Sequence, residues 1–412
     1  MSKKVKVGVF GGRRGQVMVS VMSQHPDAEL VAICDSSQQK LDECKAIADS
    51  AGAKISLYQD FEEFFEHDMD AVVLANYATE HAPYAIRLLN SGRHVCSENV
   101  ACENVAEAVA LVEAVEENGK TYTYAENCCY FRGTFEMQRL YKSGVLGEFL
   151  HGEGEYIHDC EAIWHSLTYG DKNHWRVWSP STFYCTHSLG PIMSITGLRP
   201  VKISAYETPN VNSRRYGRQG SDGSIMVCQM SNGGTAKIMP WCGFKREPGS
   251  LWYAVYGTKG MVETDRWGEQ YNRINVYTEE SGSVDSYTPE FADETELSKT
   301  ISGHGGADFY TMQYFLDSIL DRPGKEKAVD VYQAMDMTLP GTLGYRSIYE
   351  GNIPLIVPDL RDKDVRDQYR NDTWCVDPKF AGPGQPLSSS SFGRVDIPDT
   401  VYEKQAQIFK GS

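Results

Sequence analysis

The sequence lacks any uncharged apolar run as long as a membrane-spanning helix, and its first residues contain neither an apolar signal segment nor a small-residue cleavage site. It also lacks a Cys-x-x-Cys pair, and its 11 cysteines are an odd number, so a disulfide framework is not indicated. Reduced thiols are typical of a reducing compartment. We therefore expect a cytoplasmic protein with no membrane partner.

Positive charge is also scarce. The 40 Lys and Arg residues are outnumbered by 56 Asp and Glu, which gives a net charge of −16. A strongly negative surface repels nucleic acid and anionic lipid, so we expect neither as a partner and favour a small-molecule substrate. With 412 residues and 41% hydrophobic residues, the chain can bury a large core and form two domains.

Residues 1–128 alternate strand and helix signals. Apolar strand patterns occur at 5–10, 29–34, 70–75, 92–96 and 120–125. Helical patterns between them include 38–51, 81–91 and 104–118. Regular alternation of this kind predicts an α/β fold with a right-handed parallel sheet, here a Rossmann domain.

After residue 128 the pattern changes. Strand-like runs are separated by few helices, which predicts a second α/β domain over 129–357 with an open, mostly antiparallel sheet. An apolar face on such a sheet suits subunit packing, so we expect a homo-oligomer. From Pro358 the chain is polar and rich in Pro, Gly and Ser near 382–391. We expect 358–412 to be an irregular surface tail.

A glycine-rich turn follows the first predicted strand: Gly11-Gly12-Arg13-Arg14-Gly15. Such a turn before a helix suits the pyrophosphate of a dinucleotide, although the glycine spacing departs from the usual fingerprint and a purely structural turn is the alternative. Asp35 ends the next strand 24 residues after Gly11, where a carboxylate can accept the ribose hydroxyls. The following Ser36-Ser37 offers no cation for a 2′-phosphate, so NAD is favoured over NADP.

The stretch 94–101 is predicted to end a strand and enter a turn. Ligands of parallel α/β sheets bind outside the carboxyl ends of the strands, which puts Glu98 and Asn99 where cofactor meets substrate. Asn99 cannot serve as a titrating acid or base. The side chain at this position therefore decides much of the expected chemistry.

With these residues in place, the chain resembles the glucose–fructose oxidoreductase/inositol dehydrogenase (Gfo/Idh/MocA) family. The similar segments are 72–92, 94–101 and 257–260, and the resemblance runs from about residue 5 to 357. Typical members carry Glu-Lys-Pro where this chain has Glu98-Asn99-Val100, and the lysine is their catalytic acid/base. Its absence argues against ordinary dehydrogenase chemistry.

One branch of that family, the NAD-dependent glycosidases typified by α-N-acetylgalactosaminidases, also lacks the lysine. The chain is similar to this branch in several segments: Glu126-Asn127 with Tyr130, 151–159, Trp175-Arg176, 184–191 and 304–308. The connection between Tyr156 and Tyr184 is shorter than in the branch, and Cys185 replaces a proline. The sugar, anomer and aglycone are therefore left open.

The resemblance, together with the glycine turn, implies two sets of residues. Those expected to hold NAD are Gly11, Gly12, Arg13, Arg14, Asp35, Asn76, Thr79, His81, Glu98, Asn99 and Asn127. Those expected to line a carbohydrate pocket are Tyr156, Arg176, Tyr184, Thr186 and His187. Solvated arginines on a turn remain the alternative for Arg13 and Arg14.

The implied reaction begins with transient oxidation at the sugar C3, which makes the C2 proton acidic. Removal of that proton expels the C1 substituent, water adds, and re-reduction completes a redox-neutral hydrolysis. We assign Tyr156 as the base at C2, and His187 and Tyr184 as groups acting at the C3 hydroxyl and its neighbour. Arg176 would hold substrate oxygens through its planar guanidinium.

Other functions remain open at this point. One is a sugar or polyol dehydrogenase, or a 3-keto-sugar-forming enzyme, in which His187 or Tyr184 replaces the lysine. Another is a non-catalytic NAD-binding sensor or scaffold. No metal site is expected, because the spacing of His158, Asp159, Cys160 and His165 matches no common ligand pattern. The cluster Arg214, Arg215 and Arg218 is either a solvated face or a site for an anionic substituent.

Overall fold

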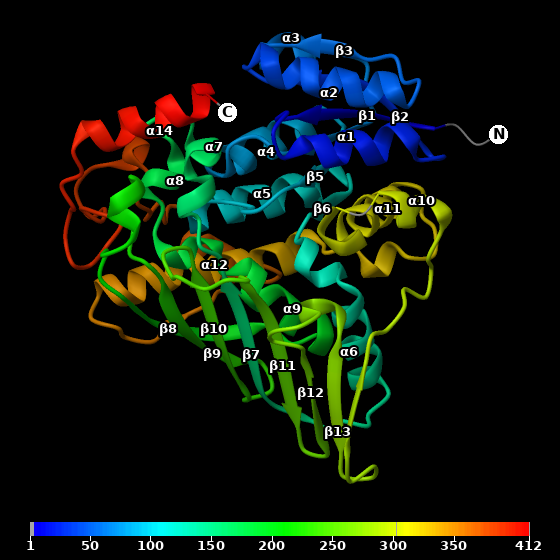
Figure 1. Cartoon of the computed structure of the whole chain (residues 1–412), viewed down its shortest axis with the longest axis vertical. Helices are drawn as coiled ribbons and strands as arrows, with labels where there is room; N and C mark the ends of the chain where they lie inside the picture. The colour runs from blue at the N-terminus through cyan, green and yellow to red at the C-terminus, as the bar shows by residue number, and fades with distance from the viewer. Residues whose placement is uncertain (1–3, 302, 412) are drawn as a thin grey trace. The chain divides into compact units, whose positions relative to one another are not determined.

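The computed structural model describes residues 4–301 and 303–411, and the chain forms two compact units (Figure 1). The first unit comprises Met1–Cys102, Ala106–Arg132 and Glu290–Met335. The second comprises Glu103–Val105, Gly133–Pro289 and Asp336–Ser412. The chain therefore returns to the first unit late in the sequence, whereas the sequence analysis put all of 290–335 in the second domain.

The first unit contains a six-stranded sheet in the order β3-β2-β1-β4-β5-β6, with every neighbouring pair parallel. Its strands are β1 (Val5–Phe10), β2 (Ala28–Cys34), β3 (Ser56–Tyr58), β4 (Ala71–Leu74), β5 (His94–Ser97) and β6 (Tyr122–Tyr124). β4 is buried along its whole length, as expected for a parallel strand covered on both faces. The predicted Rossmann fold is confirmed.

Helices connect these strands. They are α1 (Gly15–Gln24), α2 (Gln38–Ser50), α3 (Phe61–Phe65), α4 (His81–Asn90) and α5 (Val105–Asn118), with the short turns η1 (Ala78–Glu80) and η2 (Asn127–Tyr130). The later part of the unit adds α10 (Glu296–Thr300), η7 (Gly303–Gly306), α11 (Ala307–Ile319) and η8 (Lys325–Lys327). α11 packs against α1 and η2, which brings the late segment beside the glycine turn.

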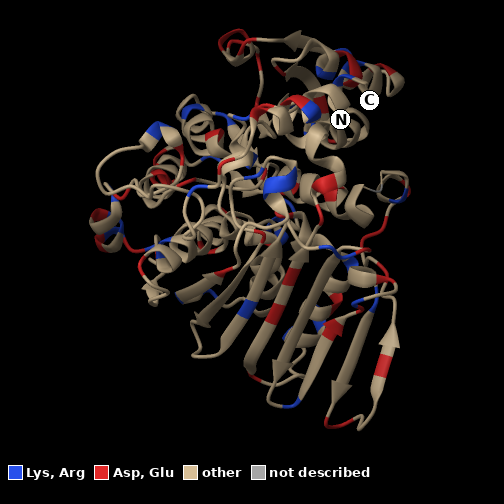
Figure 2. Cartoon of the chain, turned by 60° about the vertical axis from the view of Figure 1, so that its left-hand side comes forward, with Lys and Arg blue, Asp and Glu red and all other residues tan. Residues whose placement is uncertain are grey.

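The second unit contains a nine-stranded sheet in the order β14-β13-β12-β11-β7-β10-β9-β8-β15, in which only β7 and β10 pair in parallel. Its strands are β7 (Phe149–Ile157), β8 (Pro200–Glu207), β9 (Ser224–Met230), β10 (Thr235–Trp241), β11 (Ser250–Gly257), β12 (Gly260–Thr264), β13 (Ile274–Thr278), β14 (Val284–Tyr287) and β15 (Leu355–Ile356). Charged residues lie on neighbouring strands (Figure 2), and Lys237 of β10 forms an ion pair with Glu153 of β7. The predicted mostly antiparallel sheet is confirmed.

Helices and turns complete the second unit. They include α6 (Arg132–Lys142), η3 (Glu161–Ile163), α7 (Trp164–Thr168), α8 (Trp175–Trp178), η4 (Ser181–Tyr184), α9 (Thr186–Thr196), η5 (Ser213–Tyr216) and η6 (Gln270–Asn272). The long helix α12 (Val331–Tyr349) begins in the first unit and continues into the second from Asp336. Glycine allows α9 to lie directly on β7: a Cβ at Gly154 would be 1.9 Å from the carbonyl oxygen of Ser188. Strand alternation then turns Tyr156, two residues on, toward the same helix.

The C-terminal stretch also contains regular structure. It forms α13 (Lys363–Tyr369), η9 (Pro378–Phe380) and α14 (Asp399–Gly411), where the sequence analysis expected an irregular tail. α14 is mostly polar, and Tyr402 and Gln405 are its only residues classed as buried, so few positions in the sequence mark a buried face. No described helix is both long and apolar enough to cross a membrane. All 11 cysteines are free thiols.

Candidate active site

The glycine turn of the first unit is shaped for close approach of a ligand to its backbone. Gly11 has φ +105°, and a Cβ there would lie 2.3 Å from the carbonyl of Ala75. α1 begins four residues later, at Gly15, without a side-chain N-cap hydrogen bond. Backbone N–H groups at such a helix start are suited to a phosphate.

Asp35 is held beside this turn. One carboxylate oxygen accepts a hydrogen bond from the N–H of Gly12 at 2.6 Å, and the other accepts from the N–H of Ser37 at 2.8 Å. The side chain stays partly exposed at the end of β2. This is the arrangement expected of a carboxylate that receives ribose hydroxyls, so the residues fit the adenosine half of NAD.

Several buried side-chain atoms beside the carboxyl ends of β4 and β5 have no hydrogen-bond partner in the part of the protein that the structure describes. Among the described residues, Asn76 Oδ1, His81 Nε2 and Asn99 Oδ1 are buried with no hydrogen-bond partner. Burial lowers the pKa of His81 to about 4, so its ring is neutral and Nδ1–H donates to the carbonyl of Val100 at 2.8 Å. Buried polar atoms are normally satisfied, which supports a ligand here and fits the expected cofactor site.

Other predicted cofactor residues lie on the same unit. Thr79 is buried in η1, and Asn127 is buried at the start of η2, where the carboxylate of Glu126 caps the turn by accepting from the N–H of Cys128 at 3.1 Å. Arg13 is partly exposed on the glycine turn. Direct contact of these side chains with NAD stays a prediction.

Arg14 lies in a buried ionic network. Its Nη2 is 2.8 Å from Glu98 Oε1 and 2.6 Å from Asp308 Oδ1, in the first turn of α11. His304 Nδ1 lies 2.7 Å from the other oxygen of Asp308. Because two carboxylates already engage this guanidinium, its contact with the pyrophosphate also stays a prediction. The sequence analysis gave no role to Asp308; its signal was the matched segment 304–308 with His and Asp four residues apart.

The Asp308 carboxylate predicts a pH-dependent stability. Burial alone raises its pKa, but His304 and Arg14 outweigh burial and hold the pKa of Asp308 well below its usual value. A depressed carboxyl pKa stabilises the fold above about pH 4, and this stabilisation is lost as the pH falls further. We expect Asp308→Asn to lower the urea midpoint at pH 7, and we expect its difference from the wild type to shrink progressively as the pH falls below about 4 towards the depressed pKa of Asp308. A difference that stays constant as the pH falls would contradict this linkage.

The proposed acid–base residues form one cluster in the second unit. Tyr156 lies on β7, and its ring centroid is 4.5 Å from that of His187 in the first turn of α9. Tyr184 is the last residue of η4, and its ring centroid lies 5.2 Å from that of His187 and 6.4 Å from that of Tyr156. Tyr184 and His187 therefore lie close together, although Tyr184 belongs to a 3₁₀ turn and His187 to the following helix.

Arg176 joins this cluster from α8. Its guanidinium carbon is 4.3 Å from the ring centroid of Trp175, and its Nη2 donates to the Tyr184 hydroxyl at 3.2 Å. His174 caps the helix by accepting the Arg176 N–H at Nδ1, 3.2 Å away. No carboxylate among the described residues forms an ion pair with Arg176. The guanidinium is thus stacked and oriented but keeps donors for a substrate oxygen.

Thr186 is fully buried at the start of α9, and its contact with substrate stays a prediction. The arginine cluster does not form one patch: Arg218 is buried and donates to the carbonyls of Ser179 and Ser221, while Arg215 lies 3.9 Å from Glu161 at the surface. Sequence reasoning gave Trp175 and His174 no individual role, because stacking depends on the fold.

The fold and the nucleotide-binding features define an NAD-dependent enzyme class. Residues 5–126 match the family model described as oxidoreductase family, NAD-binding Rossmann fold. The predicted resemblance to the Gfo/Idh/MocA oxidoreductase family is confirmed over this region, and so is the NAD prediction. Residues 215–365 match a second model, described as glycosyl hydrolase 109, C-terminal domain.

Curated relatives agree with this second match. A glycosyl hydrolase family 109 protein of Saccharopolyspora erythraea is 28% identical over 391 residues, covering 86% of this chain and 83% of the relative. Glycosyl hydrolase family 109 protein 1 of Phocaeicola vulgatus is also 28% identical, and the match covers 86% of this chain and 84% of the relative. The expected resemblance to this branch is confirmed.

Solved structures share the fold. An oxidoreductase of Agrobacterium radiobacter in complex with NAD+, L-tartaric acid and magnesium has a TM-score of 0.69 at 16% identity, covering 86% of this chain and 99% of that one. Levoglucosan dehydrogenase in complex with NADH and L-sorbose has a TM-score of 0.69 at 15% identity, covering 87% and 100%. At these identities the likeness concerns architecture alone.

Proposed function

We propose that the chain is an NAD-dependent, redox-neutral glycoside hydrolase. The observation that carries the proposal is the cluster of Tyr156, Tyr184, His187 and Arg176 in the second unit. It offers several proton-transfer groups and an oriented cation within one small volume. Asn99, in place of the catalytic lysine of ordinary family members, removes the usual acid/base and makes these groups the candidates to replace it.

NAD held by the first unit would reversibly accept hydride from the sugar C3. The residues of the second unit would move the protons. Tyr184 and His187 take the proton of the C3 hydroxyl as the ketone forms, and Arg176 holds an adjacent substrate oxygen. Tyr156 would remove the acidified C2 proton, and the C1 substituent would leave with a proton taken from water. The hydroxide of that water would add at C1, and Tyr156 would return its proton to C2.

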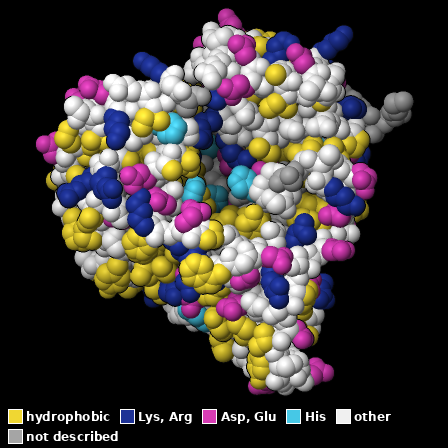
Figure 3. Space-filling model, in the orientation of Figure 1, with side chains coloured by type: hydrophobic (Ala, Val, Ile, Leu, Met, Phe, Trp, Pro, Cys, Tyr) yellow, Lys and Arg dark blue, Asp and Glu magenta, His cyan; other side chains and the backbone are white. Residues whose placement is uncertain are grey.

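The carbohydrate is the only partner that this chemistry needs. We also propose a homo-oligomer, supported by the sheet face of the second unit that lies opposite α9. On this face Tyr206 pairs with Ile225, and both side chains are exposed, as is Val227. Hydrophobic side chains gather over the strands of this unit (Figure 3). An exposed apolar sheet face of this kind is typical of a subunit interface. A cytoplasmic location remains our expectation.

The decisive experiment is a panel of aryl α- and β-glycosides with the purified protein, with and without added NAD. A sample stripped of bound cofactor is the control. Released phenol and the absorbance of NADH are followed together. The proposal expects phenol release that requires NAD while no net NADH appears.

Other outcomes discriminate the alternatives. Accumulation of NADH without phenol, from a free sugar or polyol, would move the protein to the dehydrogenases or 3-keto-sugar-forming enzymes. If neither phenol nor NADH appears, and no sugar raises the melting temperature of the NAD-bound protein, a sensor or scaffold would be favoured. Either result would overturn the hydrolase proposal.

A further inference from the structure

The segment that carries Arg176 is built from very short elements. Between β7 and α9 the chain forms η3, α7, α8 and η4, none longer than five residues. Isolated helical turns of this length are unstable in water, so their order must come from tertiary packing. Packing against other elements must therefore hold the connection 159–185 in place.

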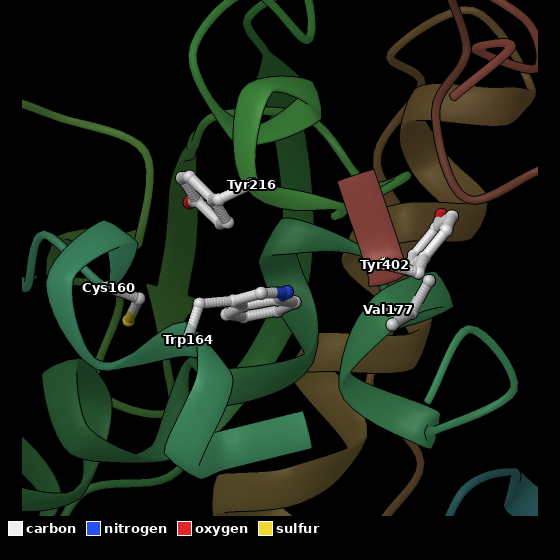
Figure 4. Packing of buried hydrophobic residues seen from close by; sticks show 5 residues of the cluster. All are labelled: Cys160, Trp164, Val177, Tyr216 and Tyr402. Atoms are coloured by element: carbon white, nitrogen blue, oxygen red, sulfur yellow. The ribbon is translucent and has the colours of Figure 1, made fainter. Parts of the chain in front are cut away.

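The C-terminal helix α14 supplies part of that packing. Within the second unit it lies against α7 and η5 (Figure 1). Tyr402 of α14 is 7% exposed and belongs to a buried cluster whose other members are Cys160, Trp164, Val177 and Tyr216. Figure 4 shows Tyr402 facing Val177, the residue next to Arg176, with Trp164 close to both. Through this cluster α14 packs against both α7 and α8.

A second contact lies one turn further along α14. At Gly170, with φ +74°, a Cβ would be 2.4 Å from the backbone nitrogen of Ala406, so only glycine permits this approach. The ring of Phe409 lies 5.0 Å from that of Tyr169. Lys172 forms an exposed ion pair with Asp399 at 3.0 Å, which contributes little by itself. The turn between α7 and α8 is thus held mainly by packing.

From this turn a continuous line of rings leads to the candidate catalytic cluster. Neighbouring ring centroids are 4.5 to 6.1 Å apart, within the range of favourable aromatic pairs. The rings in order are Phe409, Tyr169, His174, Trp175, Tyr184, His187 and Tyr156. Removing the Phe409 ring should therefore weaken the packing of Tyr169, and through Tyr169 the packing of the rings that follow it.

We propose that α14 is a positioning element of the substrate pocket, and that Phe409 and Tyr402 are its positioning residues. By fixing the 159–178 segment, they set where Trp175 and Arg176 stand relative to Tyr184. The proposal rests on the proposed function for the identity of the pocket. Neither family model covers 127–214 or 366–412, so the helix and the segment that it supports both lie outside the matched regions.

The test compares Phe409→Ala with Ile408→Ala in the full-length protein. Ile408 is the adjacent residue of α14 and is 41% exposed, so its truncation controls for loss of an apolar side chain on this helix. Phe409→Tyr keeps the ring and serves as the rescue variant. Hydrogen–deuterium exchange over 164–178, the affinity for NAD, and KM and kcat on the active glycoside are measured for each variant.

For Phe409→Ala we expect faster exchange over 164–178, unchanged NAD affinity, and a fall of about tenfold or more in kcat/KM, mostly through KM. Ile408→Ala and Phe409→Tyr should resemble the wild type. Faster exchange with unaltered KM would overturn the positioning role and leave a merely structural helix. Unchanged exchange would overturn the packing argument. If the wild type cleaves no glycoside, the proposed function fails, while exchange over 164–178 still decides whether α14 orders this segment.

Discussion

Replacing Tyr156 with Phe is expected to lower glycoside turnover by about 10²- to 10⁴-fold, the usual contribution of a general base. Tyr156 sits on β7, which is paired on both sides by β10 and β11, so the ring is held on a rigid strand. The substitution removes only the hydroxyl and keeps the ring that packs on His187. Substrate binding and folding should therefore change little while proton removal at C2 stops.

Exchange of the C2 proton separates this role from others. In deuterated water the wild type should incorporate deuterium at C2 of the released sugar, whereas Tyr156→Phe should show both slow release and little incorporation. Tyr349→Phe, which removes an exposed phenol at the end of α12, is the matched control and should behave as the wild type. Full activity in Tyr156→Phe would rule out the assignment and direct attention to Tyr184 or His187.

The parallel sheet was predictable because strongly apolar strands such as β1 and β4 alternate with regular helices. The short strand β3, with only three residues and none fully buried, was not among the predicted strands. The return of 290–335 to the first unit was not predictable from the sequence. The apolar face of α11 would have the same sequence pattern whichever unit it packed against. Its packing on α1 depends on contacts far apart in sequence, such as Gly303 beside Val17. α14 was missed for a related reason: Tyr402 and Phe409 are sparse apolar residues in a polar segment, and only their partners reveal a buried face.

At the site, residue types could be predicted but their partners could not. Asp35 beside Gly12 follows from the strand–turn–helix pattern, and Tyr156 facing α9 follows from strand alternation after Gly154. The hydrogen bond from His81 Nδ1–H to the Val100 carbonyl could not be predicted, nor could the pairing of Arg14 with carboxylates from two distant segments. The contact of both side chains with NAD stays a prediction. Sequence spacing contains no information on such long-range competition.

Arg14→Met is expected to destabilise the protein by about 3–5 kcal/mol, the usual effect of removing one partner from a buried ion pair. The guanidinium compensates two carboxylates, and the Asp308 side chain is only 1% exposed. Methionine fills a similar volume but leaves Glu98 and Asp308 facing each other without a cation. Arg139→Met is the control, because its pair with Glu136 has a mostly exposed arginine and should contribute at most about 1 kcal/mol.

The double variant Arg14→Met/Asp308→Asn distinguishes lost charge compensation from lost packing. If buried charge is the cause, neutralising Asp308 should recover part of the stability, so the double variant loses less than the sum of the single variants. Urea midpoints at several pH values provide a second measure. Protonation of Asp308 below about pH 4 should remove the penalty in Arg14→Met, and the gap from the wild type should close as the pH falls. A gap that stays constant with pH would mean that Arg14 stabilises the fold by packing alone.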